Sequence, residues 1–425
     1  MKTINNTFKD FENIPSVSLE ERVHLHNQFL NELTELGYMN YRLVITSPCG
    51  PVVQLKNVYG RQGKWYVNFS SNDYLGYTQH PDIKKVIIDA ISEYGSGSGA
   101  SPLIGGFYQY HEDLENKISS FYKKSEGSAI VYTTGYTANS ATLLSLLKKE
   151  DIAVIDMAVH SSVYEGLMGT NTKRFLHNDM LNLERILSNV KDKYRTKLVI
   201  IDGVYSQDGD TAKVQEIANI AKHYNALLML DDAHGVGVIG KTGRGVIEPN
   251  NLYSTFDIII GTLSKAIGNI GGYIVAKPEM IRYLQFQSRQ YAFSTYATPA
   301  IVGAIKAFDL INSEPKTRKQ LWENINYYKK GLIELGLNVG TTASAIIPVK
   351  IGSPQVACEV GKKLLEGGIF ANSIMYPAVA LNDARIRMSL MATHTKEHLD
   401  KALNVFEGLI KEKIIKLNGE ASKKD

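Results

Sequence analysis

The chain of 425 residues has only two cysteines, Cys49 and Cys358, and neither belongs to a CxxC motif or a Cys/His cluster. This scarcity argues against a disulfide-stapled fold and a structural zinc site, so we predict no metal. Long apolar runs are also missing: no 18 consecutive apolar residues occur, and no transmembrane segment is predicted. Residues 1–16 lack the apolar core of a signal peptide, and these absences together predict a cytoplasmic protein.

A strong excess of one charge is absent as well. Lys and Arg number 47 and Asp and Glu 43, which leaves a net charge of +4 scattered along the chain. Without a basic stripe we predict no nucleic-acid partner. Hydrophobic residues make up 44% and charged residues 21%, close to the globular average, so the chain is expected to fold. Its length suggests two or three domains.

From about residue 72 onward, short apolar runs alternate with helical segments. The predicted strands of this region are 129–132, 152–156, 198–202, 226–231 and 258–262. Continuous apolar strands that alternate with helices indicate an α/β fold, with a mostly parallel sheet covered by helices. Several polar residues stand at or just beyond the carboxyl ends of these strands, where open α/β sheets bind ligands.

The segments before residue 72 and after residue 298 have a different sequence pattern. Apolar residues at helical spacing predict a helix over 17–37, and short β-rich runs over 51–70 predict a small hairpin or meander. A long helical stretch over 298–335 precedes a small α+β unit, with strands at 346–350 and 386–390 and helices at 354–366 and 396–413. We therefore predict three parts: 1–66 with a helix and a small β segment, 67–305 as the large α/β domain, and 306–425 as the α+β domain.

Lys265 is the sharpest single signal. It follows a predicted strand in the string Gly-Thr-Leu-Ser-Lys and precedes Gly268, Gly271 and Gly272, which allow a ligand to approach the backbone closely. A lysine in such a cleft can form a Schiff base with an aldehyde cofactor. The alternative is an ordinary surface lysine.

Asp231 closes another apolar strand and begins the string Asp-Asp-Ala-His-Gly, in which His234 stands three residues on. Pyridoxal phosphate requires a carboxylate beside its pyridinium nitrogen, and a histidine there can donate to an oxygen near the ring. An Asp-rich strand end is often only a helix cap. The combination of Asp231 and His234 with Lys265 on successive strand ends favours a pyridoxal phosphate site.

The string Thr-Thr-Gly-Tyr-Thr at 133–137 joins a strand to a helix. Amide groups at a helix start bind phosphate, and the helix dipole favours the negative charge. The hydroxyls of Thr262 and Ser264 are candidates to donate to the same phosphate.

Five strings together resemble the α-oxoamine synthases, fold-type-I pyridoxal phosphate enzymes that join an amino acid to an acyl-CoA with loss of carbon dioxide. They are Ser-Asn-Asp-Tyr-Leu-Gly at 71–76, Val-Tyr-Ser-Gln-Asp-Gly-Asp at 204–210, Asp-Asp-Ala-His-Gly at 231–235, Gly-Thr-Leu-Ser-Lys at 261–265 and Ile-Arg-Met-Ser-Leu-Met-Ala-Thr-His-Thr at 386–395. The last string is most similar to bacterial serine palmitoyltransferases. The first is equally similar to 8-amino-7-oxononanoate synthases.

The resemblance implies a role for each matching cofactor residue. Lys265 would hold pyridoxal phosphate as a Schiff base and later act as the base, while Asp231 would pair with the pyridinium nitrogen. His234 and Ser206 would hold the 3′ oxygen, and His160 would stack on the ring. Either histidine would stabilise a developing oxyanion. The amides of Gly135 and Tyr136, with Thr262, would hold the phosphate.

The resemblance also implies substrate residues and a partner. Arg387 would bind the amino-acid carboxylate, with Arg385 as the alternative because side chains two apart on a strand point the same way. Asn72 would lie near the acyl-CoA site. Ser294 and Thr295 would reach into the active site of a neighbouring subunit, which predicts a homodimer with shared active sites.

One loop departs from the family pattern. Pro102 stands where the family has arginine, and Phe107 stands where a small polar residue is common. This puts the amino-acid or acyl specificity in doubt and leaves the cofactor residues untouched.

The function predicted first is serine palmitoyltransferase-like chemistry of sphingoid lipid synthesis, with a small amino acid and a long acyl-CoA as substrates. The alternatives are 8-amino-7-oxononanoate synthase, using alanine and a pimeloyl thioester in biotin synthesis, a glycine C-acetyltransferase, or an enzyme for another amino acid such as cysteate. A plain aminotransferase and a non-catalytic partner subunit remain as different classes.

Overall fold

The computed structural model describes residues 6–58 and 61–417, which divide into two compact units. The sheet unit takes residues 72–206 and 210–319, and the terminal unit takes its residues from 1–71, 207–209 and 320–425. The outer two of the three predicted parts thus contribute mainly to one unit. The boundaries after 66 and 305 stay a prediction.

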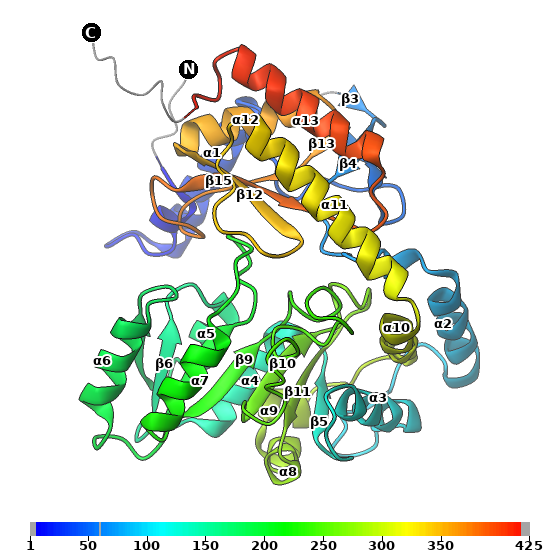
Figure 1. Cartoon of the computed structure of the whole chain (residues 1–425), viewed down its shortest axis with the longest axis vertical. Helices are drawn as coiled ribbons and strands as arrows, with labels where there is room; N and C mark the ends of the chain where they lie inside the picture. The colour runs from blue at the N-terminus through cyan, green and yellow to red at the C-terminus, as the bar shows by residue number, and fades with distance from the viewer. Residues whose placement is uncertain (1–5, 59–60, 418–425) are drawn as a thin grey trace. The chain divides into compact units, whose positions relative to one another are not determined.

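A seven-stranded sheet forms the centre of the sheet unit (Figure 1), in the order β5-β11-β10-β9-β8-β6-β7. The strands are β5 Ala129–Tyr132, β6 Ile152–Asp156, β7 Asn171–Phe175, β8 Lys197–Asp202, β9 Leu227–Asp231, β10 Ile258–Thr262 and β11 Gly272–Ala276. Every pairing is parallel except the two made by β11. The prediction of a mostly parallel sheet in an α/β fold is confirmed.

Helices cover both faces of this sheet. The helices of the sheet unit are α2 Pro81–Tyr94, α3 Gln109–Phe121, α4 Gly135–Leu146, α5 Ser161–Gly166, α6 Met180–Val190, α7 Val214–His223, α8 Pro278–Gln287, α9 Arg289–Ala292 and α10 Val302–Ser313. Of these, α3, α4, α6, α7 and α8 pack directly on its strands. Crossovers between parallel strands are right-handed, so connections that run in opposite directions along the sheet lie on opposite faces. Accordingly α4 packs beside α5, while α6 packs beside α7.

The terminal unit is built on two small sheets, β1-β4-β13 and β12-β15-β14, and a hairpin, β2-β3. The strands are β1 Val52–Gln54, β2 Asn57–Val58, β3 Arg61–Gln62, β4 Trp65–Asn68, β12 Ile346–Gly352, β13 Ile369–Phe370, β14 Asn372–Ile374 and β15 Ala384–Ser389. Its helices include α1 Leu19–Glu35, α12 Pro354–Glu366 and α13 Lys396–Lys411. Helix α12 packs on the sheet of β12, β15 and β14 (Figure 1).

The long helical stretch predicted over 298–335 is interrupted. Helix α10 ends at Ser313, and α11 begins at Pro315 and runs to Glu334. Glu314 has φ −116° and ψ 62°, outside the helical region. A proline disfavours helical geometry in the residue before it, which explains the break.

The carboxyl ends of three neighbouring strands bring polar residues to one edge of the sheet. Asp202 ends β8, Asp231 ends β9 and Thr262 ends β10. Asp202 and Asp231 are paired directly across the β8–β9 ladder, and Asp231 is paired with Ile260 of β10. Two carboxyl groups and a hydroxyl therefore converge at the edge where parallel sheets bind ligands.

Within the described residues, every helix is too short or too polar to cross a bilayer.

Candidate active site

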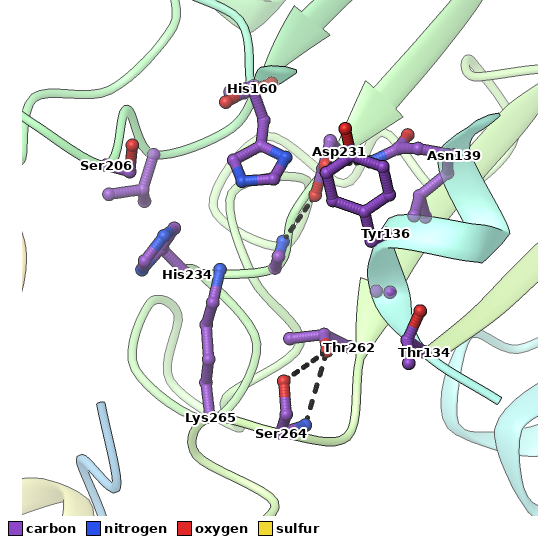
Figure 2. Close-up of a pocket in the computed structure, with 16 residues that line it drawn as sticks. Thr134, Tyr136, Asn139, His160, Ser206, Asp231, His234, Thr262, Ser264 and Lys265 are labelled. Carbon is purple, nitrogen blue, oxygen red and sulfur yellow. Dashed lines mark hydrogen bonds between the residues drawn. The ribbon is translucent and has the colours of Figure 1, made fainter. Parts of the chain in front are cut away.

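A cavity of about 250 Å³ lies at this edge of the sheet. It is lined by Thr134, Gly135, Tyr136, Asn139, His160, Asp202, Val204, Ser206, Asp231, Ala233, His234, Ile260, Gly261, Thr262, Ser264 and Lys265. Every residue that the sequence predicts to bind the cofactor is among them. Figure 2 shows how their side chains face the common space.

Lys265 stands on a tight loop after β10. The amide of Gly268 donates to the carbonyl of Lys265 at 2.9 Å, and the amide of Asn269 donates to the carbonyl of Leu263 at 2.7 Å. Gly268 has φ +71°, and a Cβ there would lie 2.7 Å from the amide nitrogen of Thr78. The backbone beneath Lys265 is therefore fixed, and its side chain extends into the space between His234, His160 and Asp231 (Figure 2).

The carboxylate of Asp231 is held by two donors. Asn139 Nδ2 donates to Oδ2 at 2.6 Å, and the amide of Ala233 donates to Oδ1 at 3.0 Å. Both Asp231 and Asn139 are buried, and Asn139 comes from the first turns of α4. The two bonds fix the carboxylate where a protonated ring nitrogen would need it.

His160 caps the N-terminus of α5. Its Nδ1 lies 2.8 Å from the hydroxyl of Ser162 and 3.3 Å from that residue's amide nitrogen. Burial lowers the pKa of His160, Asp231 acts in the opposite direction, and Lys265 lowers it further. The imidazole is therefore neutral near pH 7. A neutral ring stacks on a protonated pyridinium without charge repulsion.

His234 belongs to a chain of three side chains. Its Nδ1 lies 2.7 Å from the hydroxyl of Tyr74, which in turn donates to Oδ1 of Asn72 at 3.2 Å. Tyr74 is completely buried. The single proton of the Tyr74 hydroxyl is donated to Asn72. The hydroxyl oxygen therefore accepts a hydrogen bond from His234 Nδ1–H. That arrangement fixes the histidine ring and its tautomer.

The N-terminus of α4 and the end of β10 bring together groups of the kind that bind anions. Thr134 caps the helix and accepts from the amide of Thr137 at 2.9 Å. A Cβ on Gly135 would lie 2.8 Å from Oγ1 of Thr262, so only glycine fits this approach. Oγ1 of Thr262 is 2.8 Å from Oγ of Ser264. Helix dipole, amides and hydroxyls converge as a phosphate group requires.

Two buried polar atoms in the cavity wall have no hydrogen-bond partner among the described residues: Oδ1 of Asp202 and Oδ1 of Asn139. Burial raises the pKa of Asp202 well above its usual value, and Asp231 adds to this effect. An orphaned acceptor in a wall otherwise built of donors and carboxylates is satisfied by a polar ligand. The residues present therefore fit pyridoxal phosphate.

The four predicted substrate residues do not line the cavity. Asn72 is connected to it through Tyr74. Ser294 and Thr295 are exposed on the segment after α9. Arg387 lies on β15 in the terminal unit, where its Nη1 donates to Oγ of Ser389 at 2.7 Å.

Arg385, the alternative to Arg387, is engaged elsewhere in the terminal unit. Its side chain is 1% exposed and forms ion pairs with Asp208 and Asp383. Lys350 Nζ lies 3.2 Å from the same Asp208 oxygen. Arg385 is therefore committed to a structural network, which leaves Arg387 as the carboxylate candidate.

Pro102 occupies a turn. The carbonyl of Ser101 accepts from the amides of Ile104 at 3.2 Å and Gly106 at 2.9 Å. Proline at the second position of such a turn has the required φ. The departure from the family pattern thus leaves the cavity residues unaltered.

Sequence reasoning missed three residues of the site. Asn139 and Asp202 line the cavity, and Tyr74 supports His234. Asn139 stands one turn beyond Gly135 and faces the same way, a spacing that the helical period makes readable. Asp202 ends an apolar strand as Asp231 does, and this position could have predicted that it lies in the site.

Comparison with known proteins identifies the family. The aminotransferase class I and II model matches residues 64–406. The 8-amino-7-oxononanoate synthase of Thermoanaerobacter pseudethanolicus is 42% identical over 381 residues, covering 89% of this chain and 94% of that protein. The chain belongs to the aminotransferase class I and II family.

Solved structures of this family have the same fold. The serine palmitoyltransferase of Sphingomonas wittichii is 30% identical and matches 94% of this chain and 100% of its own, with a TM-score of 0.87. A structure of SPT with its PLP internal aldimine is 28% identical, with the same coverage and TM-score. The predicted fold-type-I transferase architecture is confirmed, as is the predicted cofactor, pyridoxal phosphate.

The class of enzyme is confirmed as well: the chain is a pyridoxal phosphate-dependent acyltransferase of the α-oxoamine synthase type. Within that type, relatives at about 40% identity are named 8-amino-7-oxononanoate synthase. The predicted alternative is thus better supported than the serine palmitoyltransferase function that was placed first.

Proposed function

We propose that this enzyme condenses a small amino acid with an acyl thioester, releasing carbon dioxide and the free thiol, and that alanine and a pimeloyl thioester are the first substrates to test. The observation that carries the proposal is the cavity in which Lys265 faces the anchored carboxylate of Asp231. The names of the 40%-identical relatives support the choice of substrates. Serine with palmitoyl-CoA is the second candidate, supported by the likeness to serine palmitoyltransferase structures.

The cavity residues would hold pyridoxal phosphate at three points. The α4 N-terminus with Thr262 and Ser264 would bind the phosphate, Asp231 the ring nitrogen, and Lys265 Nζ the aldehyde carbon. His160 would cover one face of the ring, and His234 with Ser206 would lie at the 3′ oxygen. When bound, the cofactor supplies an electron sink that stabilises negative charge at the Cα of the amino acid.

The protein side chains then manage protons and charge. Lys265 Nζ would accept the proton of the substrate Cα–H as a general base. Asp231 would favour a protonated ring nitrogen. Cα attacks the acyl carbonyl and the thiolate leaves, so that one carbon–carbon bond replaces one carbon–sulfur bond. The neutral imidazole of His160, whose Nδ1 accepts from the Ser162 amide, would donate from Nε2–H toward the developing oxyanion. Carbon dioxide leaves, and Nζ returns a proton to Cα.

The test is a panel of amino acids and acyl thioesters. Purified protein should show a visible absorption band, and thiol release should be fastest with one pair among alanine, serine, glycine and cysteate against pimeloyl, palmitoyl and acetyl thioesters. Lys265→Ala should abolish both the band and thiol release. Lys84→Ala, which changes an exposed lysine of α2, is the matched control. A Lys265→Ala variant with the wild-type spectrum and rate would refute the proposal.

A further inference from the structure

Outside the cavity wall, His177 lies between two carboxylates of the sheet unit. Its Nδ1 is 3.1 Å from Oδ1 and 3.2 Å from Oδ2 of Asp156, and its Nε2 is 2.9 Å from Oδ2 of Asp210. Asp156 ends β6 and its side chain is 0% exposed, whereas that of His177 is 29% exposed. Both ring nitrogens therefore bond to carboxylates, which requires N–H groups on both.

The charge state agrees with this geometry. Burial lowers the pKa of His177, but hydrogen bonds and charges from Asp156 and Asp210 outweigh burial and raise the pKa to about 10. The imidazolium is the form present at neutral pH. Charge-assisted hydrogen bonds of this kind are roughly twice as strong as neutral ones.

The backbone next to His177 is shaped to serve the same two carboxylates. Asn178 has φ +53°, a conformation that asparagine tolerates better than most residues. Its amide donates to Asp156 Oδ2 at 3.0 Å, and its Nδ2 lies 3.3 Å from Asp210 Oδ2 and 3.1 Å from the carbonyl oxygen of Thr211. Two consecutive residues thus hold the end of β6 and the segment at Asp210 together.

That segment is one arm of the turn that presents Ser206 to the cavity. The amide of Tyr205 donates to the carbonyl of Asp210 at 3.0 Å, and Val204 and Thr211 form an antiparallel bridge. The His177 ring stands edge-on to the Tyr205 ring, with centroids 4.3 Å apart. His177 therefore touches both arms: Asp210 by a hydrogen bond and Tyr205, the neighbour of Ser206, by ring packing.

We propose that His177 is a positioning residue for the cofactor: by bridging Asp156 to Asp210 it fixes the two arms of the turn and so sets the place of Ser206 at the ring's 3′ oxygen. The proposal rests on the proposed function, since it concerns the same cavity. His177 itself lies outside the cavity lining. Its effect must pass through the turn.

The test is a double-mutant cycle read by cofactor affinity rather than by turnover. Apoenzyme is titrated with pyridoxal phosphate, and its thermal midpoint is measured in parallel. His177→Gln should weaken binding about tenfold, the scale of one hydrogen bond to a charged group. Ser206→Ala should weaken binding in the wild-type background but by less than about twofold in the His177→Gln background, because the two changes remove one shared interaction. His223→Gln, an exposed histidine at the end of α7, is the matched control and should behave as wild type.

Asp210→Asn provides a second route if His177→Gln folds poorly. It weakens the same bridge from the other end while keeping the shape of the side chain, so it should also suppress the effect of Ser206→Ala. A full Ser206→Ala effect in both backgrounds, or unchanged cofactor affinity in His177→Gln, overturns the proposal and leaves the proposed function standing. A wild-type protein that takes up no pyridoxal phosphate overturns both.

Discussion

At the scale of single residues, Asn139 decides how well Asp231 is placed. Its amide donates to one carboxylate oxygen at 2.6 Å inside a buried wall, while the backbone of Ala233 holds the other oxygen. A hydrogen bond to a charged group contributes about 1.5–3 kcal/mol. The position of Asp231 Oδ2 thus depends on Asn139, a residue that itself has no reactive group.

Asn139→Ala should therefore weaken pyridoxal phosphate binding about tenfold or more, as measured by titrating the apoenzyme. Asn139→Asp should bind pyridoxal phosphate more weakly than Asn139→Ala, because it sets a second carboxylate against Asp231. Equal affinities for the Asp and Ala variants would contradict this account.

Arg387 is the remaining candidate for the substrate carboxylate, since Arg385 is buried in ion pairs. Arg387→Ala should leave cofactor affinity unchanged and weaken amino-acid binding by about tenfold or more, because a bidentate charge-assisted pair is lost. Arg387→Lys should recover little, since an ammonium does not reproduce the planar fork. Spectral titration with alanine, serine, glycine and cysteate measures both.

Arg22→Ala on α1 is the control for this experiment. If Arg387 served only the fold, its Ala variant would lose thermal stability and bind every amino acid as wild type does. That result would remove Arg387 from the substrate site.

The sequence predicts the reactive residues better than their supports. Asp231 and Thr262 were readable because each ends an apolar strand, and Lys265 because it follows directly after one. Tyr74 and Asn139 were not assigned roles, because their partners are distant in the sequence: Tyr74 meets His234 160 positions away, and Asn139 meets Asp231 92 positions away. Only the tertiary fold creates such pairs.

At the scale of elements, the first turn of α4 forms part of the proposed phosphate site. Gly135 has no room for a side chain, because a Cβ would lie 2.8 Å from Oγ1 and 3.0 Å from Cβ of Thr262. Gly135→Ala should therefore separate the helix end from β10. Affinity for pyridoxal phosphate should fall about tenfold or more, whereas affinity for pyridoxal, which lacks the phosphate, should change little. Equal losses for both ligands would show a general disturbance instead.

Helix α3 carries a buried acid. Glu115 Oε1 accepts from the amide of Val131 on β5 at 3.0 Å and from the hydroxyl of Tyr296 at 3.2 Å. Burial raises the pKa of Glu115 from 4.5 to about 8. Between these values the folded protein binds a proton that the unfolded chain has released, so the free energy of unfolding falls as the pH rises from 4.5 to 8.

Glu115→Gln removes this titration and keeps an oxygen that accepts both bonds. Relative to wild type, the variant should gain stability between pH 5 and pH 8, by about 1.4 kcal/mol for every tenfold difference in proton affinity between folded and unfolded Glu115. Asp113→Asn, an exposed position on the same helix, should show no such gain. Chemical denaturation at the two pH values measures the difference. If the free energy of unfolding changed equally with pH in wild type and Glu115→Gln, the raised pKa of Glu115 would be contradicted.

Two strands of the sheet escaped prediction for opposite reasons. Strand β7 is one of the two edge strands and is mostly exposed, so its sequence Asn-Thr-Lys-Arg-Phe has no apolar run. Strand β11 is apolar but begins directly at Gly272, and we interpreted the glycines only as space for a ligand. In both cases the tertiary fold decides which segment becomes a strand, and the local sequence pattern alone does not identify it.

At the scale of the whole molecule, the homodimer with shared active sites stays a prediction. Ser294 and Thr295 are exposed and do not line the cavity of their own chain. A variant of Lys265 and a variant of the 294–295 segment, each inactive alone, should recover part of the activity when mixed and re-associated, because one site in the mixed dimer has neither defect. A fully active monomer by light scattering would exclude the shared site.

The terminal unit combines segments from both ends of the sequence, which matters while the chain is being synthesised. The β4 segment pairs with β13, Ser70 donates to the carbonyl of Phe370 300 positions away, and the carbonyl of Asn68 lies 3.0 Å from Nε2 of His394, 326 positions away. At about 5–20 residues per second, a ribosome needs about 15–60 s to deliver these partners after β4 emerges. Throughout that interval the backbone hydrogen-bonding edge of β4 that later pairs with β13 is unpaired, and an unpaired strand edge promotes aggregation. Nascent chains arrested before residue 369 should therefore depend on holdase chaperones, and released full-length chains should not.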